Sequence, residues 1–118
     1  MGQHGKRRHY VTIQKRTNAR DPESRELYPE NDDRAWEDYA IEVPGELAAV
    51  GGVGGGGERI RNVQMEAGED SFFITQYRDD ISPLMRIIYN GRILNVKRVF
   101  DRFGKRREII IGLREVTI

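Results

Sequence analysis

The chain has 118 residues and no cysteine, and charged residues make up 33% of it against 37% for hydrophobic ones. This length predicts a single soluble domain with a modest core, and the lack of cysteine excludes disulfides and thiolate metal sites. The net charge of +1 alone says nothing about binding to nucleic acid or membrane, and no apolar run is long enough for a membrane span or signal peptide.

The first predicted element is a strand at His9–Arg16, which follows a basic N-terminal arm at residues 1–8. Within it, Val11 and Ile13 alternate with polar or aromatic neighbours, and this period of two is typical of a half-buried strand. The next residues are rich in Asn, Asp, Pro and charge and show no apolar period. We therefore expect residues 17–34 to form an exposed, flexible loop.

The stretch from Trp36 to Val43 fits neither the helical nor the strand period, and Trp36 is interpreted as a core or interface anchor. Pro44-Gly45 is predicted to end whatever element precedes it. A short apolar run at Glu46–Val50 then favours a strand.

A run of glycines follows at Gly51–Gly57, and glycine has the largest backbone entropy to lose on folding. The run formally contains G-x-G-x-x-G, but Glu58-Arg59 replaces the Lys-Ser/Thr pair of a phosphate-binding loop. A dinucleotide site would also need a βαβ crossover, whereas the following chain is a meander. We therefore expect a flexible loop at residues 50–57.

Glu58–Ala67 is predicted to be a short helix, because its apolar residues recur at helical spacing. Asp70–Arg78 is predicted to be a strand with aromatic side chains on both faces. Such a strand needs cover on its outer face, which the helix or a neighbouring subunit would provide.

The C-terminal part, Asp80–Val116, is predicted to be a three-stranded antiparallel meander. Asn90-Gly91 lies between β-branched and aromatic residues and predicts a type I′ hairpin turn, in which both residues need positive φ. Gly104 is the expected left-handed residue of the second turn. Together with the upstream strands, the meander predicts an antiparallel barrel or a strongly curved sheet. Its prominent apolar positions are Ile87, Ile93, Val96, Val99, Ile109, Ile111 and Leu113.

No residue pattern predicts a catalytic, cofactor-binding or metal site. His4 and His9 have no further ligands at suitable spacing and are interpreted as part of a solvated tail. The basic clusters Lys6–Arg8 and Lys105–Arg107 are most simply solvated surfaces, but in a ring they could face a polyanion. An exposed strand edge and surplus apolar surface also predict assembly into a ring.

Several segments, in this order, resemble the head–tail joining family of tailed bacteriophages. The resemblance covers nearly the full chain and rests on segments Val11–Arg16, Trp36–Asp38, Gly51–Ala67, Phe73–Arg78, Met85–Val96 and Arg107–Val116. It implies a mainly β protein, a small antiparallel β-barrel with one short helix and long flexible loops, without enzyme activity or cofactor.

The resemblance also implies a place in the virion. The protein would form a twelve-fold ring in the phage neck, with the portal or adaptor protein above it and the tail or a tail-completion protein below it. It would assemble in the host cytoplasm, contact no membrane and lie close to DNA in the channel. In stopper members a loop between the second and third strands blocks DNA escape. The corresponding candidate channel loop contains Gly51, Gly52, Val53, Gly54, Gly55, Gly56, Gly57, Arg59 and Arg61.

A second hypothesis is a monomeric small β-barrel that binds nucleic acid directly. Such modules place aromatic and basic side chains together on an exposed sheet face. Tyr77, Arg86, Tyr89 and Arg92 are the residues that could form one here. Oligomeric state distinguishes this hypothesis from the neck protein.

Overall fold

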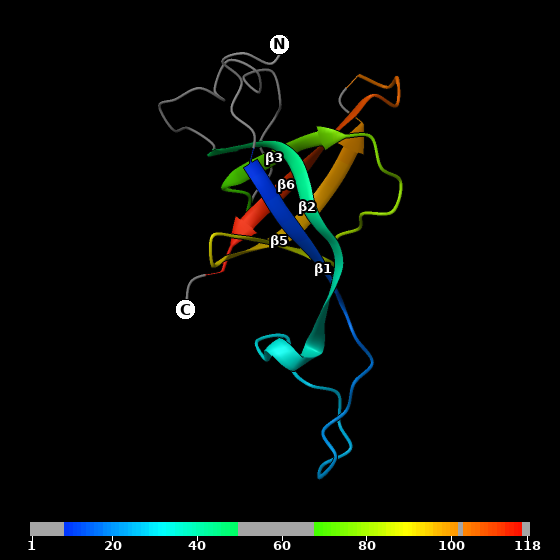
Figure 1. The fold of residues 1–118 in the computed structure, drawn as a ribbon, viewed down its shortest axis with the longest axis vertical. Coiled ribbons are helices and arrows are strands. Elements are labelled where there is room, and N and C mark those ends of the chain that lie inside the picture. The colour runs from blue at the N-terminus through cyan, green and yellow to red at the C-terminus, as the bar shows by residue number, and fades with distance from the viewer. Residues whose placement is uncertain (1–8, 50–67, 102, 117–118) are drawn as a thin grey trace.

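The computed structural model describes residues 9–49, 68–101 and 103–116, and shows a closed six-stranded barrel with strand order β1-β2-β3-β6-β5-β4 (Figure 1). Every pairing is antiparallel. The strands are β1 (His9–Arg16), β2 (Trp36–Ala49), β3 (Ser71–Gln76), β4 (Arg86–Tyr89), β5 (Arg92–Asp101) and β6 (Glu108–Glu115), and a short 3-10 helix, η1 (Asp33–Ala35), precedes β2. The predicted antiparallel barrel is therefore confirmed.

The barrel interior is filled by side chains that alternate along the strands. Its fully or nearly fully buried members are Val11, Ile13, Val43, Phe73, Ile81, Ile87, Leu94, Val96, Ile109, Ile111 and Leu113. Most of the predicted apolar positions lie in this set. Val99 is only partly buried against it, and Ile93 is also partly exposed.

A second apolar cluster lies on the other face of the sheet, as the aromatic residues on both faces of β3 predict. Phe72 and Ile74 of β3 contact Ala48 and Ile110 there, and all four side chains are at most 7% exposed. The predicted helix at residues 58–67 lies outside the described residues. Its role, or that of a neighbouring subunit, as the cover therefore stays a prediction.

The hairpin turns follow from local residue chemistry. Asn90 has a φ of 50° and Gly91 a φ of 77°, so both residues between β4 and β5 adopt the left-handed backbone that the type I′ turn needs. Gly104, between β5 and β6, has a φ of 70°. The predicted turns at both positions are confirmed.

The prediction that Pro44-Gly45 ends an element is wrong, because β2 runs through both residues. Proline lacks an N–H, so it is tolerated where a ladder hydrogen bond is not needed. Pro44 pairs with Tyr10 of β1, and pairing with β3 starts one residue later, at Gly45. Gly45 is itself required, because a Cβ there would overlap the ring of Phe73.

The predicted exposed strand edge does not exist among the described strands. β1 pairs with β4, placing Ile13 beside Ile87, and this contact closes the sheet on itself. Closure removes the unpaired edge on which an additional strand could form. The predicted ring assembly stays a prediction, and it would have to use side chains and loops rather than edge-to-edge pairing of the described strands.

Residues 17–35, which we name the β1–β2 extension, leave the barrel between its first two strands and project well beyond it (Figure 1). Their only β-bridge joins Arg20 to Leu27. The predicted exposed loop, residues 17–34, contains no buried residue, and Ala35, which follows it, is 1% exposed. Its predicted flexibility stays a prediction.

Candidate functional site

The candidate channel loop lies outside the described residues, which resume only at its flanks, Ala49 before it and Gly68 after it. Gly51–Gly57, Arg59 and Arg61 all fall within residues 50–67. β2 ends at Ala49, which is the antiparallel partner of Ser71 at the start of β3. The described ends of the β2–β3 connection therefore lie side by side on neighbouring strands.

The second end of this loop is held by a buried ion pair. Arg98 donates from Nε and Nη2 to the Glu69 carboxylate, at 2.6 and 3.1 Å, and the Glu69 side chain is only 1% exposed. A two-pronged pair of this kind restrains orientation as well as distance. The carboxylate lies against Gly112, where any Cβ would overlap it, and the Arg98 guanidinium stacks 4.5 Å from the centre of the Phe100 ring.

The residue after Glu69 adds a second attachment. Asp70 donates its backbone N–H to the carbonyl of Leu113 at 2.8 Å, and its carboxylate accepts the backbone N–H of Glu115. Together, Glu69 and Asp70 tie this end of the loop to β5 and β6. Sequence reasoning missed both, because their partners lie 29 and 45 residues further along the chain and no local pattern joins them.

The base of the β1–β2 extension is built around Trp36. The guanidinium carbons of Arg86 and Arg16 lie 4.4 and 5.5 Å from the centre of the Trp36 ring. Arg86 is only 5% exposed, and its Nε donates to Oε1 of Gln14 at 2.8 Å. Burial lowers the pKa of Arg86, and the carboxylate of Asp33 partly offsets this effect. Nε1 of Trp36 donates to the carbonyl of Glu30 in the extension at 2.8 Å, so Trp36 holds the extension and belongs to neither core cluster, and the predicted interface role stays a prediction.

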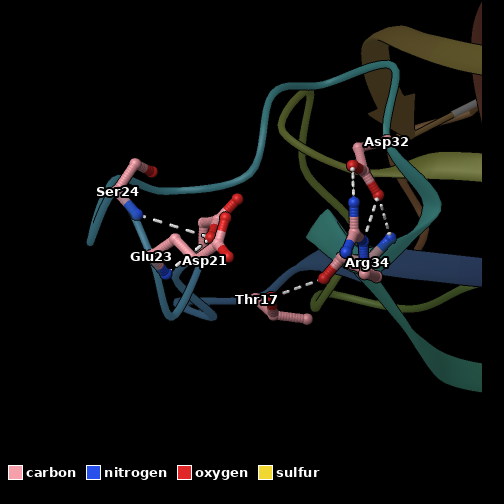
Figure 2. Close-up of polar contacts among 6 residues, drawn as sticks. All are labelled: Thr17, Asp21, Glu23, Ser24, Asp32 and Arg34. Carbon is pink, nitrogen blue, oxygen red and sulfur yellow. Dashed lines mark hydrogen bonds and ion pairs between the residues drawn. The ribbon is translucent and has the colours of Figure 1, made fainter.

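Short-range polar contacts shape the rest of the extension (Figure 2). The Asp21 carboxylate accepts the backbone N–H groups of Glu23 and Ser24, and Asp32 accepts both the backbone and the guanidinium of Arg34. The Arg34 guanidinium holds the pKa of Asp32 below its usual value. Aspartate commonly supports turns in this way. The extension is therefore shaped by its own side chains.

The loop after β3 is tied to β2 by a second charged cluster. Asp80 accepts two hydrogen bonds from the Arg78 guanidinium, each 3.0 Å, and one from the Tyr39 hydroxyl at 2.8 Å. The Arg78 hydrogen bonds lower the pKa of Asp80 to about 2, against desolvation and with help from Tyr39. The hydrogen bond between the Tyr39 hydroxyl and Asp80 raises the pKa of Tyr39.

An exposed basic turn joins β5 to β6, at the opposite end of the molecule from the β1–β2 extension (Figure 1). We name residues 103–107 the basic turn. Asp101 accepts backbone N–H groups from Phe103, Gly104 and Arg106, so the turn has a defined shape. Desolvation raises the pKa of Asp101, but these N–H groups outweigh it and the net shift is downward.

The cations of the basic turn are available to an external partner. Lys105, Arg106 and Arg107 are exposed, and none forms an ion pair within the described part of the chain. Phe103 is 62% exposed beside them. A hollow of about 640 Å³ runs between Gln76, Phe103, Lys105, Arg107 and Glu108. Aromatic and basic side chains together are typical of surfaces that bind polyanions.

The face predicted for direct nucleic-acid binding does not form. Arg86 is buried against Trp36, and Arg92 makes a two-pronged pair with Glu115 at 2.8 and 3.0 Å. Tyr77 and Tyr89 pack against the barrel core. These four residues therefore serve the fold, and the aromatic and basic residues that do gather lie on the basic turn.

The two histidines do not form a site that can be described. His4 lies outside the described residues, whereas His9 is part of β1 and not of a solvated tail. Its Nδ1 accepts the backbone N–H of Leu47 at 3.0 Å. Its ring packs edge-on against the Tyr89 ring, with the two ring centres 5.4 Å apart. Over residues 9–49, 68–101 and 103–116, no group of three His, Cys, Asp or Glu side chains is placed to hold a metal ion. In the same ranges no helix is long and apolar enough to cross a membrane.

Comparison with known proteins gives a family and a structural relative. The model of one protein family, described as phage head completion protein, matches residues 3–116. The solution structure of protein SF1141 from Shigella flexneri 2a is similar, with a TM-score of 0.62, 24% sequence identity, and coverage of 91% of this chain and 90% of that chain. That likeness supports the fold alone. No curated protein matches the sequence.

Proposed function

We propose that this chain, which belongs to the phage head completion protein family, forms a ring in the neck of the virion, below the portal or adaptor protein. It has a structural role in the phage head, where completion prepares the particle for the tail. The proposed ring is twelve-fold, joins the head to the tail or a tail-completion protein, and assembles in the host cytoplasm. DNA would pass through or lie close to its channel.

The observation that carries this proposal is the pairing of a closed barrel with a projecting β1–β2 extension. The barrel has no open edge among its strands, so it is complete without a neighbour. The extension, by contrast, contacts the barrel at its base, where Arg16 and Trp36 donate hydrogen bonds to the carbonyls of Tyr28 and Glu30. An ordered projection of this kind is suited to holding another protein, as a joining protein must.

The first experiment tests assembly. Purified protein is mixed with purified portal–adaptor complexes and imaged by negative-stain electron microscopy. We expect an additional ring at the end of each complex, and none when the protein is omitted. A protein that stays monomeric with these complexes, although correctly folded by circular dichroism, contradicts the neck function.

DNA retention is the more specific part of the proposal and concerns the candidate channel loop. Support comes from its place between β2 and β3 and from the attachment of its end through Glu69 and Arg98. Shortening Gly51–Gly57 should leave thermal unfolding nearly unchanged, because loop-closure entropy varies only with the logarithm of length. The variant should package DNA but lose it from tailless heads.

Two further variants sharpen the retention test. Replacing Arg59 and Arg61 with Glu should also reduce retention, because it places negative charge near phosphate. A loop of unchanged length with alternating Gly and Ser should retain DNA as the wild type does. If heads with the shortened loop retain as much DNA as wild-type heads, the channel role is contradicted. Only variants that unfold at the wild-type temperature are compared.

The alternative, a monomeric β-barrel module that binds nucleic acid directly, is favoured by the basic turn. The test is fluorescence anisotropy of a labelled DNA duplex, titrated with monomeric protein at two salt concentrations. If the alternative is right, the wild-type monomer binds the duplex more weakly at higher salt. The double variant Lys105→Glu, Arg107→Glu then no longer binds it. Arg20→Glu with Arg25→Glu makes the same change in net charge on the β1–β2 extension and is the matched control. Absence of binding by the wild-type monomer argues for the neck ring.

A further inference from the structure

We infer that each copy in the proposed ring is oriented with the basic turn toward the channel, where its cations contact the phosphate backbone of DNA, and with the β1–β2 extension directed away from it. This inference rests on the proposed neck ring and names the surface and the orientation by which that ring meets DNA. It commits to one partner, a phosphodiester backbone.

The two ends of the molecule carry opposite charge. The basic turn contains three cations and no carboxylate, a net charge of +3, whereas the extension contains six carboxylates and three arginines, a net charge of −3. The two regions lie at opposite ends of the molecule (Figure 1). A polyanion attracts the first region and repels the second, so its field orients the chain with the basic turn toward it.

The cations of the basic turn also lack the carboxylate partners that cations have elsewhere on the same hairpin. On the strand that leads into the turn, Arg92 is paired with Glu115 and Arg98 with Glu69. None of the three cations of the turn forms an ion pair within the described part of the chain. Binding to phosphate would neutralise them and release the counterions of the DNA.

The backbone of the turn has a defined shape before any partner binds. The Asp101 carboxylate accepts the N–H groups of Phe103, Gly104 and Arg106 at 3.3, 2.9 and 2.8 Å. Arg106 has a φ of 56°, a left-handed conformation that residues other than glycine seldom adopt. Residues held in such conformations cluster at functional sites. Contact with a partner therefore requires little further ordering of this backbone.

The hollow beside the turn offers donors for phosphate oxygens. It measures about 640 Å³, and Gln76, Lys105 and Arg107 contribute its donor groups. Glu108 is the one carboxylate among its lining residues, so the two cations outnumber it. Phosphate would therefore bind over Lys105 and Arg107, at the rim that the turn forms. Such contacts hold a DNA backbone without reading its sequence.

The ring multiplies a contact that is weak in one copy. Three cations attract DNA only weakly, but a ring presents the same turn from every copy to one duplex, and each contact raises the effective concentration for the next. DNA can meet all of the copies, because phosphates recur along both strands whatever the sequence. An acidic protein would need to repeat its surface with the symmetry of the ring. The repeated turn therefore favours DNA as the partner.

This contact is separate from the candidate channel loop. That loop precedes Ser71 at the start of β3, whereas Gln76 at the end of β3 pairs with Glu108, which directly follows the basic turn. The two regions lie at opposite ends of one strand. The basic turn can therefore be altered while the candidate channel loop stays as it is.

The first test measures DNA binding by the assembled ring. Portal–adaptor complexes with and without the added protein are titrated against a labelled DNA duplex at two salt concentrations, and anisotropy is recorded. Lys105→Glu with Arg107→Glu should add a ring as the wild type does, but should weaken the binding due to the ring at least about tenfold and reduce its salt dependence. Lys97→Glu with Arg114→Glu is the matched control. It makes the same change in net charge at exposed positions on β5 and β6, and should bind DNA as the wild type does.

The second test identifies the partner and the orientation by photocrosslinking in DNA-filled tailless heads. The variants Phe103→p-benzoylphenylalanine and Leu27→p-benzoylphenylalanine place the probe on the basic turn and on the extension, at positions that are 62% and 47% exposed. Irradiation should link the first variant to DNA and the second to protein alone. A probe on the basic turn that links only to protein overturns the inference, as does a probe on the extension that links to DNA instead.

The binding test separates this inference from the neck function. If wild-type protein adds a ring without adding DNA affinity, or if the double variant on the turn binds DNA as the wild type does, the neck function stands and the DNA contact is wrong. An equal loss of binding in the control also overturns the contact. If the double variant on the turn is folded but adds no ring, the turn serves a protein interface. If wild-type protein adds no ring, the neck function fails and the inference fails with it.

Discussion

The barrel interior and the β1–β2 extension are stabilised by different kinds of contact. The interior is formed by apolar side chains from all six strands, including Ile13, Phe73 and Ile111, which are essentially unexposed. The extension buries only Ala35 and depends on hydrogen bonds, an ion pair and cation–π stacking among its own residues. Apolar burial joins distant parts of the chain at once, whereas the polar contacts of the extension are mostly local.

This difference predicts two levels of stability in one domain. Regions with few buried apolar contacts open at lower free energy than the core that supports them. The extension should therefore unfold locally while the barrel stays intact. In the proposed joining function this division would be useful, because an extension that meets other chains could adjust without loss of the fold.

The largest expected effect comes from a cavity in the barrel. Phe73→Ala removes an unexposed ring and should lower the free energy of unfolding by about 3–5 kcal/mol, as measured by urea denaturation. Leu27→Ala at the tip of the extension should change it by less than about 0.5 kcal/mol, since that side chain packs against little of its own chain. Similar costs for the two would remove the distinction between the regions.

A smaller effect is expected where the two regions meet. Arg86→Met keeps most of the side-chain stem but removes the stacking on Trp36 and leaves Gln14 without its donor, at a cost of about 1–3 kcal/mol. Amide hydrogen exchange should accelerate chiefly in residues 17–35. Arg92→Met, which breaks an exposed ion pair, should cost about 0–1 kcal/mol and leave exchange in the extension unchanged. Faster exchange throughout β6 in Arg86→Met would show that Arg86 supports the whole barrel.

The β4–β5 turn tests how far local chemistry supports the barrel. Gly91 has a φ of 77°, where a β-branched residue is strained, so Gly91→Val should destabilise the domain by about 1 kcal/mol or more. Gly91→Asn should be tolerated better, because asparagine adopts this backbone conformation more readily. Thermal unfolding measures both variants. A wild-type melting temperature for Gly91→Val would contradict the turn.

The smallest effect is expected at Asp80 and depends on pH. Its pKa of about 2 in the folded state is below the ordinary value of 3.8, so its contribution is present above about pH 4 and is lost as the pH falls toward 2. Asp80→Asn should therefore destabilise by about 0.2–1 kcal/mol at neutral pH, because the pair with Arg78 is partly exposed. Urea denaturation from pH 7 to pH 2 should show the two proteins converging in acid. A constant difference across this range would contradict the assignment.

Local patterns in the sequence were sufficient for much of the barrel. Asn90-Gly91 specified its own turn, and the alternation around Val11 and Ile13 specified which face of β1 is buried. The aromatic residues on both faces of β3 correctly indicated that Phe72 and Phe73 are both buried. Each of these features depends on neighbours within a few residues, which is why it can be read from the sequence.

The same reasoning failed where a residue's partner is distant in the chain. Pro44 did not end its strand, because β2 changes partners beside it. Arg86 was taken for a surface residue, although Trp36, 50 positions earlier, draws it into the base of the extension. Glu69 carried no signal at all, since its role depends on Arg98 and on the space above Gly112.

By itself, then, the sequence determined the turns, the strand faces and the composition of the core, because backbone preferences and apolar periodicity act over short distances. Only the tertiary structure decided that β1 meets β4, that the sheet therefore has no open edge, and that an arginine–tryptophan stack supports a projecting extension. Those outcomes depend on which segments come together when the sheet curves and closes. Closure brings together residues that are far apart in the sequence, and contacts of that kind produce no local sequence pattern.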